Sequence, residues 1–338
     1  MTRYAAAAAA PGRNEENAMA RVSSVCMSLC VALLLAPCAL AQYPTKPIRL
    51  VVPFPAGGAA DFTARVVAQP VSQALGQTIV VDDRGGGDGA VAGVLVMNAA
   101  PDGYTLFFAT NSPMSAVPTL HRNPPYDPLK DFTPITTICR FTFFLFTTPS
   151  LPVHNVKELI EYAKANPGKL NYGTGNTTAI IASAQMKALA GVDMQQIPYK
   201  GDAATTADML GGRIQLAFMA MVPGYAQAKD GKLRMLAVLL QRRTALAPDV
   251  PTLTEAGLPG VTIAPWGGLF GPAKMPRAVV QRLSREFNAA LQRADVRAQL
   301  TSQGIEAEGS TPQQLAAFTG EQIGLWRRII REANIPVE

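Results

Sequence analysis

The chain has 338 residues, of which 48% are hydrophobic and 16% are charged. This composition is typical of a folded globular protein, and the length leaves room for two domains with cores of their own. The net charge of +6 is spread along the chain without a basic block. We therefore expect no nucleic-acid binding, whereas an anionic small ligand is compatible with this charge.

The first 41 residues have the pattern of a signal for export. Arg21 gives a positive start, residues 25–36 form an apolar core, and Ala39-Leu40-Ala41 is a small-x-small cleavage site. The apolar run is too short to span a bilayer, although a membrane anchor is the alternative. We expect residues 1–41 to be a signal peptide with an N-terminal extension, which predicts export from the cytoplasm. Only Cys139 then remains in the mature chain, and its strand-like surroundings predict a buried thiol rather than a reactive one.

The first structured motif is Ile48-Arg-Leu-Val-Val-Pro-Phe-Pro-Ala-Gly-Gly-Ala-Ala-Asp61. Its apolar start predicts a buried strand, Gly57 and Gly58 predict a loop, and Asp61 occupies the expected N-cap of a helix. A strand, a glycine loop and a helix N-terminus together direct free backbone N–H groups at one point, which suits an anion. The spacing matches neither common nucleotide motif, so a carboxylate fits better. A tight turn without a ligand is the alternative. Pro70 predicts a kink or an early stop in the following helix.

Strand and helix patterns alternate along the rest of the chain, which predicts an α/β fold with largely parallel sheets. The expected strands are Ile48–Pro53, Thr78–Val81, Tyr104–Ala109, Phe143–Thr148, Lys169–Tyr172, Met194–Ile197, Ile214–Met219, Leu233–Leu239 and Gly268–Gly271.

Capping residues mark several of the intervening helices. Asn155 with Glu158 forms a capping box, and Thr311 with Gln314 forms another before the last helix. A second glycine-rich loop, Tyr172-Gly-Thr-Gly-Asn-Thr-Thr178, also leads into a helical pattern. If Thr177 and Thr178 cap that helix, its free N–H groups offer a second anion site; capping alone is the alternative.

The residues of an enzyme active site are missing. His121 and His154 are the only histidines, and neither accompanies a nucleophile motif or a metal-binding cluster. The pair Asp82-Asp83 beside Arg84 suits acid–base chemistry or, more simply, a salt bridge. The run from Gly85 to Gly89 suits a phosphate cradle or a surface connection. We expect no catalysis, no cofactor and no metal.

Many short motifs, in one order, resemble a known family. They are Tyr43-Pro-Thr-Lys-Pro-Ile-Arg-Leu-Val-Val-Pro-Phe-Pro-Ala-Gly-Gly58 with Asp61 and Arg65, Val80-Val-Asp-Asp-Arg84, Pro101-Asp-Gly-Tyr-Thr-Leu106, Pro125-Tyr-Asp-Pro128, Ala165-Asn-Pro-Gly-Lys-Leu-Asn-Tyr-Gly173, Pro198-Tyr-Lys-Gly201, Gly231-Lys-Leu-Arg234 and Pro248-Asp-Val-Pro-Thr252 with Glu255-Ala-Gly-Leu-Pro259. They resemble the Bug-type proteins, which are periplasmic substrate-binding components of tripartite tricarboxylate transporters.

The resemblance implies a type II periplasmic-binding-protein fold, with two α/β domains joined by a hinge that closes on a ligand. Residues 42–147 with 265–338 would form domain 1, and residues 148–264 would form domain 2. The resemblance further implies a monomer that captures a small organic carboxylate and delivers it to membrane transporter subunits. A sensor component that docks on a membrane signalling receptor is the alternative.

In this family, backbone amides of two loops, one from each domain, hold a ligand carboxylate. The ligand-binding residues implied here are Phe54, Ala56, Gly57, Gly58, Ala59, Ala60, Asp61, Thr110, Asn111, Ser112, Gly173, Thr174, Gly175, Asn176, Thr177, Thr178, Lys200, Gly201 and Met219.

Three departures from the family pattern concern the far end of the ligand. Met114, Ile180 and Met219 stand where relatives often carry polar residues. An apolar far end, suited to a monocarboxylate with an aromatic or aliphatic tail, is one interpretation. That the three residues are simply core is the other.

Overall fold

Two β-sheets, one of six strands and one of five, organise the chain. The computed structural model describes Thr2, residues 43–261, Ile263, residues 265–332, Ile335 and Val337. Residues 44–338 form one compact unit, which contains both sheets. The expected signal peptide lies outside the described residues. No helix in the described part of the chain has both the length and the apolar character needed to cross a bilayer.

The first sheet has the strand order β11-β4-β10-β3-β1-β2. Its strands are β1 (Ile48–Val52), β2 (Ile79–Asp83), β3 (Thr105–Thr110), β4 (Phe132–Phe141), β10 (Trp266–Pro272) and β11 (Ile305–Ala307). Strand β1 pairs in parallel with β2 and β3, whereas β10 is antiparallel to both β3 and β4. We call the part of the chain built on this sheet lobe 1.

The second sheet has the order β7-β6-β8-β5-β9, and the part built on it is lobe 2. Its strands are β5 (Phe143–Thr147), β6 (Asn171–Thr174), β7 (Gln195–Pro198), β8 (Leu216–Ala220) and β9 (Arg234–Val238). Strand β6 is parallel to β7 and β8, but β5 is antiparallel to β8 and β9. Both sheets are therefore mixed, and the expectation of largely parallel sheets is wrong. The reason is that each sheet receives a strand, β10 or β5, that enters from the other lobe.

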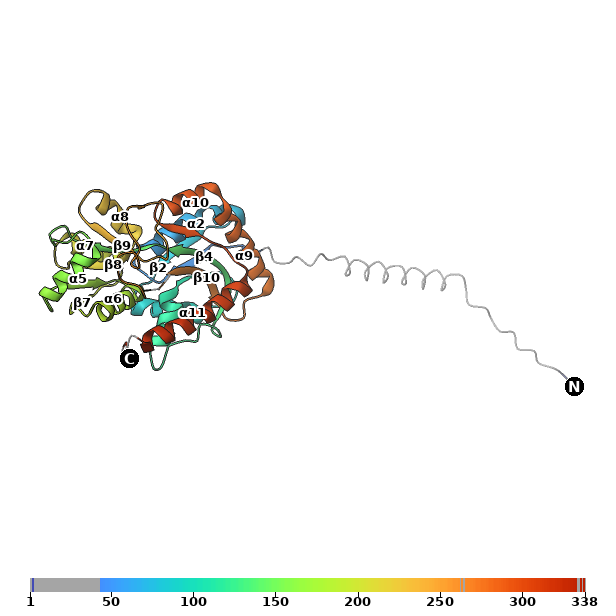
Figure 1. The fold of residues 1–338 in the computed structure, drawn as a ribbon. Helices are drawn as coiled ribbons and strands as arrows, with labels where there is room; N and C mark the ends of the chain where they lie inside the picture. The colour runs from blue at the N-terminus through green and yellow to red at the C-terminus, as the bar shows by residue number, and fades with distance from the viewer. Residues whose placement is uncertain are drawn as a thin grey trace. The chain divides into compact units, whose positions relative to one another are not determined.

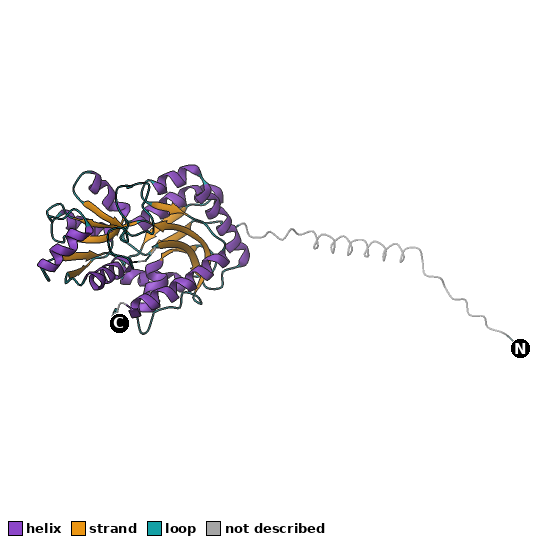
Figure 2. Cartoon of the chain, in the orientation of Figure 1, coloured by secondary structure: helices purple, strands orange, loops and turns teal. Residues whose placement is uncertain are grey.

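Helices cover the faces of both sheets, so that the strands lie between helical layers (Figures 1 and 2). The helices of lobe 1 are α2 (Ala59–Leu75), η1 (Gly87–Gly89), α3 (Ala90–Met97), η2 (Ser112–Ala116), α4 (Val117–Leu120), α9 (Arg277–Gln292), α10 (Ala294–Thr301) and α11 (Pro312–Glu332). Those of lobe 2 are α5 (Val156–Ala165), α6 (Thr177–Ala190), α7 (Asp202–Leu210) and α8 (Met221–Lys229).

Local capping chemistry explains where two of these helices begin. Glu158 N–H donates to Asn155 Oδ1 at 2.9 Å before α5, and Gln314 N–H donates to Thr311 Oγ1 at 3.2 Å before α11. Both capping boxes are confirmed. Pro70, in contrast, lies inside α2 without ending it. The early stop is therefore wrong, because the buried face of α2 holds the helix together beyond the proline.

The chain passes from lobe 1 to lobe 2 at Thr142, between β4 and β5. The division into domains of residues 42–147 with 265–338 and of residues 148–264 stays a proposal. Strand β5 belongs to the sheet of lobe 2. At the expected return boundary, Ala264 lies outside the described residues.

Cys139 lies in β4 and is 0% exposed. Burial raises the pKa of its thiol, so the reactive thiolate is scarce. We predict that Cys139 in the mature chain does not react with a disulfide reagent such as DTNB under native conditions, but reacts fully in denaturant. Stoichiometric native labelling within minutes would contradict this burial.

Candidate functional site

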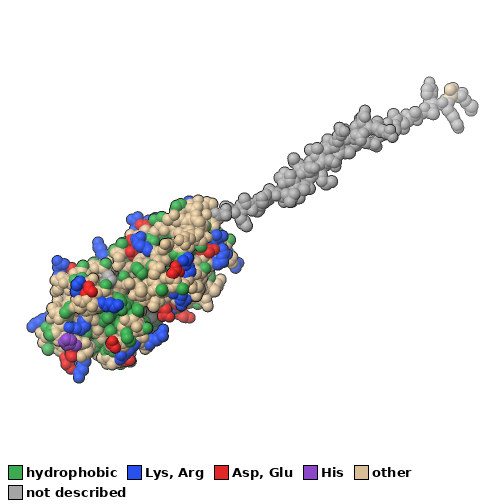
Figure 3. Space-filling model, turned by 90° about the horizontal axis from the view of Figure 1, so that it is seen from above, with side chains coloured by type: hydrophobic (Ala, Val, Ile, Leu, Met, Phe, Trp, Pro, Cys, Tyr) green, Lys and Arg blue, Asp and Glu red, His purple; other side chains and the backbone are tan. Residues whose placement is uncertain are grey.

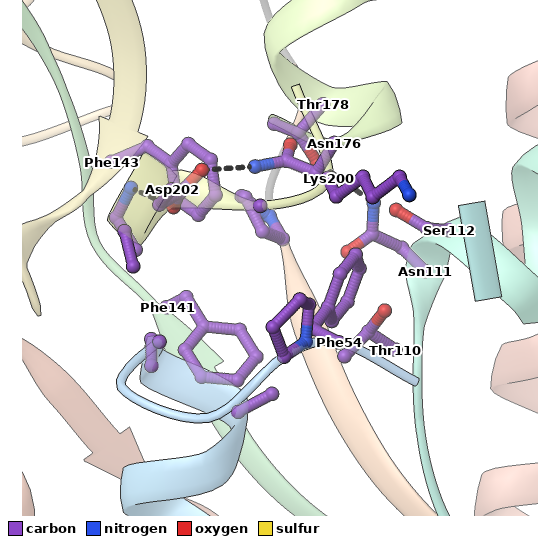
Figure 4. A pocket seen from close by; sticks show the side chains of 18 of the residues that line it. Phe54, Thr110, Asn111, Ser112, Phe141, Phe143, Asn176, Thr178, Lys200 and Asp202 are labelled. Carbon is purple, nitrogen blue, oxygen red and sulfur yellow. Dashed lines mark hydrogen bonds between the residues drawn. The ribbon is translucent and has the colours of Figure 1, made fainter. Parts of the chain in front are cut away.

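A cavity of about 100 Å³ lies where loops from the two lobes meet (Figure 4). Its wall combines apolar side chains with a few polar groups, as the walls of small-molecule sites usually do. Five strands lead into it at their carboxyl ends, namely β1, β3, β6, β7 and β8. In α/β proteins ligands bind at this edge because the loops leading into the next helices gather there.

The structure brings most of the sequence-predicted residues together around this cavity. Those that line it are Phe54, Gly58, Ala59, Ala60, Thr110, Asn111, Ser112, Asn176, Thr178, Lys200 and Gly201. Those that do not line it are Ala56, Gly57, Asp61, Gly173, Thr174, Gly175, Thr177 and Met219. Lining residues that sequence reasoning missed are Pro55, Phe141, Phe143, Asp202, Ala203, Ala204, Ala220 and Pro265.

The first of three helix N-termini at the cavity is that of α2. Its N-cap is Gly58, so the expectation that Asp61 is the N-cap is wrong. Asp61 lies inside the first turn, where its Oδ2 accepts from Gly57 N–H at 2.9 Å and its Oδ1 lies 2.6 Å from Arg65 Nε. The N–H groups of Ala59 and Ala60 have no acceptor among the residues described. These donors are available to an anion.

The second N-terminus is that of α6, and here too the cap differs from expectation. Asn176 is the N-cap, with its Oδ1 accepting from Ala179 N–H at 3.0 Å. The hydroxyls of Thr177 and Thr178 bond across to lobe 1 instead. Thr177 Oγ1 donates to Ser112 Oγ at 2.6 Å, and Asn111 Nδ2 donates to Thr178 Oγ1 at 2.8 Å. The two threonines thus join the lobes rather than cap the helix.

The third N-terminus at the cavity is that of α7. The sequence analysis included Lys200 and Gly201 before this helix, but not the residues of its first turn. Its N-cap is Gly201, which has no capping side chain, and Asp202, Ala203 and Ala204 in its first turn all line the cavity. The sequence carried a signal for it: a strand is followed by Lys200-Gly201-Asp202 and then a helix, the same order as in the first loop.

Close packing around two glycines fixes the position of α7. A Cβ on Gly175 would lie 2.6 Å from the carbonyl carbon of Gly201 and 2.9 Å from Asp202 Oδ1. A Cβ on Gly201 would lie 3.4 Å from Pro55 Cδ in lobe 1. The loop before α6 therefore packs directly on the start of α7. Pro55 in the first loop of lobe 1 packs against Gly201 at that same start.

Asp202 is a buried carboxyl group on the cavity wall, 9% exposed. Its Oδ1 accepts from Asn176 Nδ2 at 2.7 Å and its Oδ2 accepts from Ala220 N–H at 3.0 Å. Burial raises the pKa of Asp202 to about 7, although both hydrogen bonds act to lower it. In Figure 4, Asp202 and Phe143 lie on one side of the cavity, and Asn111, Ser112 and Thr110 lie on the other.

Aromatic side chains form much of the remaining wall, namely Phe54, Phe141 and Phe143. The apolar residues expected at the far end of the ligand do not contribute to it. Met114 and Met219 are fully buried in the cores of lobe 1 and lobe 2, and Ile180 does not line the cavity either. The interpretation of Met114 and Met219 as core is therefore correct, because both side chains point into packed interiors.

Two polar groups of the cavity have no partner in the described part of the chain. Thr110 Oγ1 is buried and makes no hydrogen bond there. Lys200 is exposed at the cavity edge, and neither an ion pair nor a hydrogen bond holds its ammonium group within that same part. Both groups can interact with a ligand.

The other candidates from the sequence have structural roles. Asp82 pairs with Arg84 at 3.0 Å and with Arg49, and Asp83 pairs with Arg65 at 3.0 Å. The expected salt bridge of Asp82 with Arg84 is confirmed. Within the glycine run from Gly85 to Gly89, the two end residues pack against the first loop: a Cβ on Gly85 would lie 2.9 Å from Pro55, and one on Gly89 2.8 Å from Pro53. His154 is exposed and His121 half-buried, and neither lines the cavity.

Comparison with known proteins identifies the family. Residues 63–335 match the tripartite tricarboxylate transporter family receptor. The chain belongs to this family. It is 32% identical over 302 residues to the protein BugT of Bordetella pertussis, covering 88% of this chain and 93% of BugT. The resemblance to Bug-type proteins is thereby confirmed.

Solved structures agree with this assignment. The R. palustris protein Rpa4515 with adipate is 33% identical with a TM-score of 0.84, covering 87% of this chain and 99% of that one. MatC from Rhodopseudomonas palustris with bound malate is 28% identical with a TM-score of 0.81, covering 85% and 100%. The expected periplasmic-binding-protein fold is confirmed, and the family is one of solute-binding receptors.

The raised pKa of Asp202 predicts a specific dependence of the receptor's stability on pH. A folded-state pKa of about 7 against about 4 in the unfolded chain gives stability that is complete below pH 4. This stability is lost as the pH rises toward 7. In urea unfolding of the ligand-free receptor, the wild type should lose about 2–3 kcal/mol between pH 5 and pH 8 relative to Asp202→Asn.

Asp295→Asn is the control, because Asp295 is an exposed residue of α10 with a lowered pKa. That variant should follow the wild type across this pH range. Parallel curves for the wild type and Asp202→Asn would show that Asp202 is ionised throughout.

Proposed function

We propose that this receptor captures a small organic carboxylate between its lobes and delivers it to the membrane subunits of a tripartite tricarboxylate-type transporter. The observation that carries the proposal is the convergence of the N-termini of α2, α6 and α7 on one cavity. Each N-terminus carries about half a positive charge and unpaired N–H groups. An anion placed between them satisfies donors from both lobes at once, which makes closure depend on the ligand.

The energetics suit a receptor that must also release its ligand. A hydrogen bond to a charged group contributes about 1.5–3 kcal/mol. A few such bonds, less the cost of closing the lobes, correspond to about micromolar affinity. No arginine of the described part of the chain lines the cavity. The backbone, Lys200 and the hydroxyl of Thr110 would therefore hold the head group.

The rest of the ligand would lie against the aromatic wall. Phe54, Phe141 and Phe143 contribute apolar surface, which favours a hydrocarbon body behind the carboxylate. Rpa4515 was solved with adipate and MatC with malate, which supports small aliphatic acids as the ligand class here.

The remaining parts of the proposal concern location and partners. Membership of this receptor family supports a periplasmic location and transporter subunits as partners. Loops from both lobes of the same chain line the cavity, and we propose that the receptor acts as a monomer. The Lys and Arg side chains are dispersed among acidic ones on the face shown in Figure 3, in keeping with a small ligand rather than a nucleic acid.

The test is Gly58→Val, analysed by isothermal titration calorimetry against C4 to C8 mono- and dicarboxylates. Gly58 lines the cavity at extended backbone angles, φ −91° and ψ 173°, and a Cβ there would meet only Pro55 O at 3.8 Å. The variant should fold normally and lose at least a hundredfold in affinity, because the larger side chain fills the space of the carboxylate.

Gly320→Val is the matched control, since a Cβ at this position of α11 would meet nothing within 4 Å. It should bind as the wild type does. Wild-type affinity in Gly58→Val would remove the first loop from the site. If the wild type binds none of these acids, and native mass spectrometry of the purified protein shows no retained acid, the proposed function is wrong.

A further inference from the structure

We propose that Asp202 makes this cavity selective for carboxylates whose far end is neutral or donates hydrogen bonds, and that it excludes dicarboxylates. The inference rests on the proposed function, because it concerns the second end of a ligand whose first carboxylate is already bound. It assigns a specificity-determining residue that sequence reasoning did not find.

The charges on the cavity wall come from few side chains. Among the residues that the structure describes, Lys200 and Asp202 are the ionisable side chains that line it. Lys200 is exposed at the edge, where water screens it, whereas Asp202 is buried. Asp61 does not line the cavity and pairs with Arg65. Asp202 therefore dominates the field on its own side of the cavity.

The charge of Asp202 opposes that of the helix it begins. The N-terminus of α7 contributes about half a positive charge. An ionised Asp202 in the first turn outweighs it and leaves that side of the cavity with a net negative charge. In the first turn of α2, the carboxylate of Asp61 is paired with Arg65, and the first turn of α6 holds no acidic residue. These two N-termini therefore remain the favourable place for a ligand's carboxylate. A second carboxylate would then face Asp202.

Asp202 cannot turn away from the cavity. Its two oxygens are held by Asn176 Nδ2 at 2.7 Å and Ala220 N–H at 3.0 Å. Gly175 packs against Oδ1. The groups facing it are an amide from the N-cap of α6, a backbone N–H from β8 and Phe143 from β5 (Figure 4). None of these neighbours carries a positive charge that could cancel the carboxylate.

Each oxygen of Asp202 accepts one hydrogen bond in this arrangement, although a carboxylate has about four acceptor positions in all. An ammonium or hydroxyl group of a ligand can therefore donate a hydrogen bond to the same carboxylate without displacing Asn176 or Ala220. The pKa of about 7 for Asp202 supports a pH-dependent form of this selectivity. Above that pH the side chain is an anion that repels a second carboxylate, and below it a neutral acid that does not.

The test compares three acids of equal chain length by calorimetry at pH 8: hexanoate, 6-aminohexanoate and adipate. The wild type should bind adipate at least tenfold more weakly than hexanoate. In Asp202→Asn this difference should fall to within about threefold, and 6-aminohexanoate should weaken relative to hexanoate. The control Asp295→Asn should keep the wild-type order.

A titration of the wild type at pH 6 provides the same comparison without a mutation, in case Asp202→Asn does not fold. The penalty on adipate should shrink there by at least fivefold relative to hexanoate. Equal binding of adipate and hexanoate by the wild type at pH 8 would overturn this inference but not the proposed function. So would a preference that changes neither with pH nor in Asp202→Asn. If all three acids and their four-carbon counterparts fail to bind, both this inference and the proposed function are wrong.

Discussion

The site depends on one constraint, which is that the first N–H groups of a helix have no partner inside the helix. Parallel strands of an α/β fold place such helix starts at one edge of a sheet. Strands of both sheets lead into the same cavity at their carboxyl ends, and three helix N-termini, those of α2, α6 and α7, meet there. No cationic side chain is needed to make this place attractive to an anion, because the polypeptide backbone supplies both the partial charge and the donors.

The contacts between the lobes are built into the same loops. Thr177 and Thr178 follow the helix cap Asn176, and both hydroxyls bond to lobe 1. Within lobe 1, Asn111 Oδ1 also accepts from Trp266 N–H at 3.4 Å, at the start of β10, the strand that returns from lobe 2. The elements that hold the lobes together thus directly border the cavity. A ligand that pulls the helix N-termini together would therefore stabilise the same closed arrangement that these hydrogen bonds require.

The sequence predicted the parts of this structure that are local. Nine strands were found within a few residues, since each is a short apolar run ending at a loop. Strands β4 and β11 were not among the expected strands. The strand-like residues around Cys139 belong to β4, but Pro134 interrupts its local pattern, and its partners β10 and β11 lie far along the chain. The caps were misplaced for a similar reason. The Thr177 and Thr178 hydroxyls are used in tertiary contacts with Ser112 and Asn111, which no local pattern reveals.

Asp202 shows most clearly where local reasoning stops. An aspartate at the start of a helix is ordinarily a favourable surface residue, and nothing in the sequence distinguishes it from that case. Its burial arises from Ala220 at the end of another strand and from the side chain of Asn176. Burying a charge is costly, and here two hydrogen bonds and the helix N-terminus offset part of that cost. Because the remainder raises the pKa of Asp202 to about 7, the charge on this side of the cavity is set by tertiary packing. A fold shared with receptors for dicarboxylates can therefore present a different field to its ligand through one buried side chain.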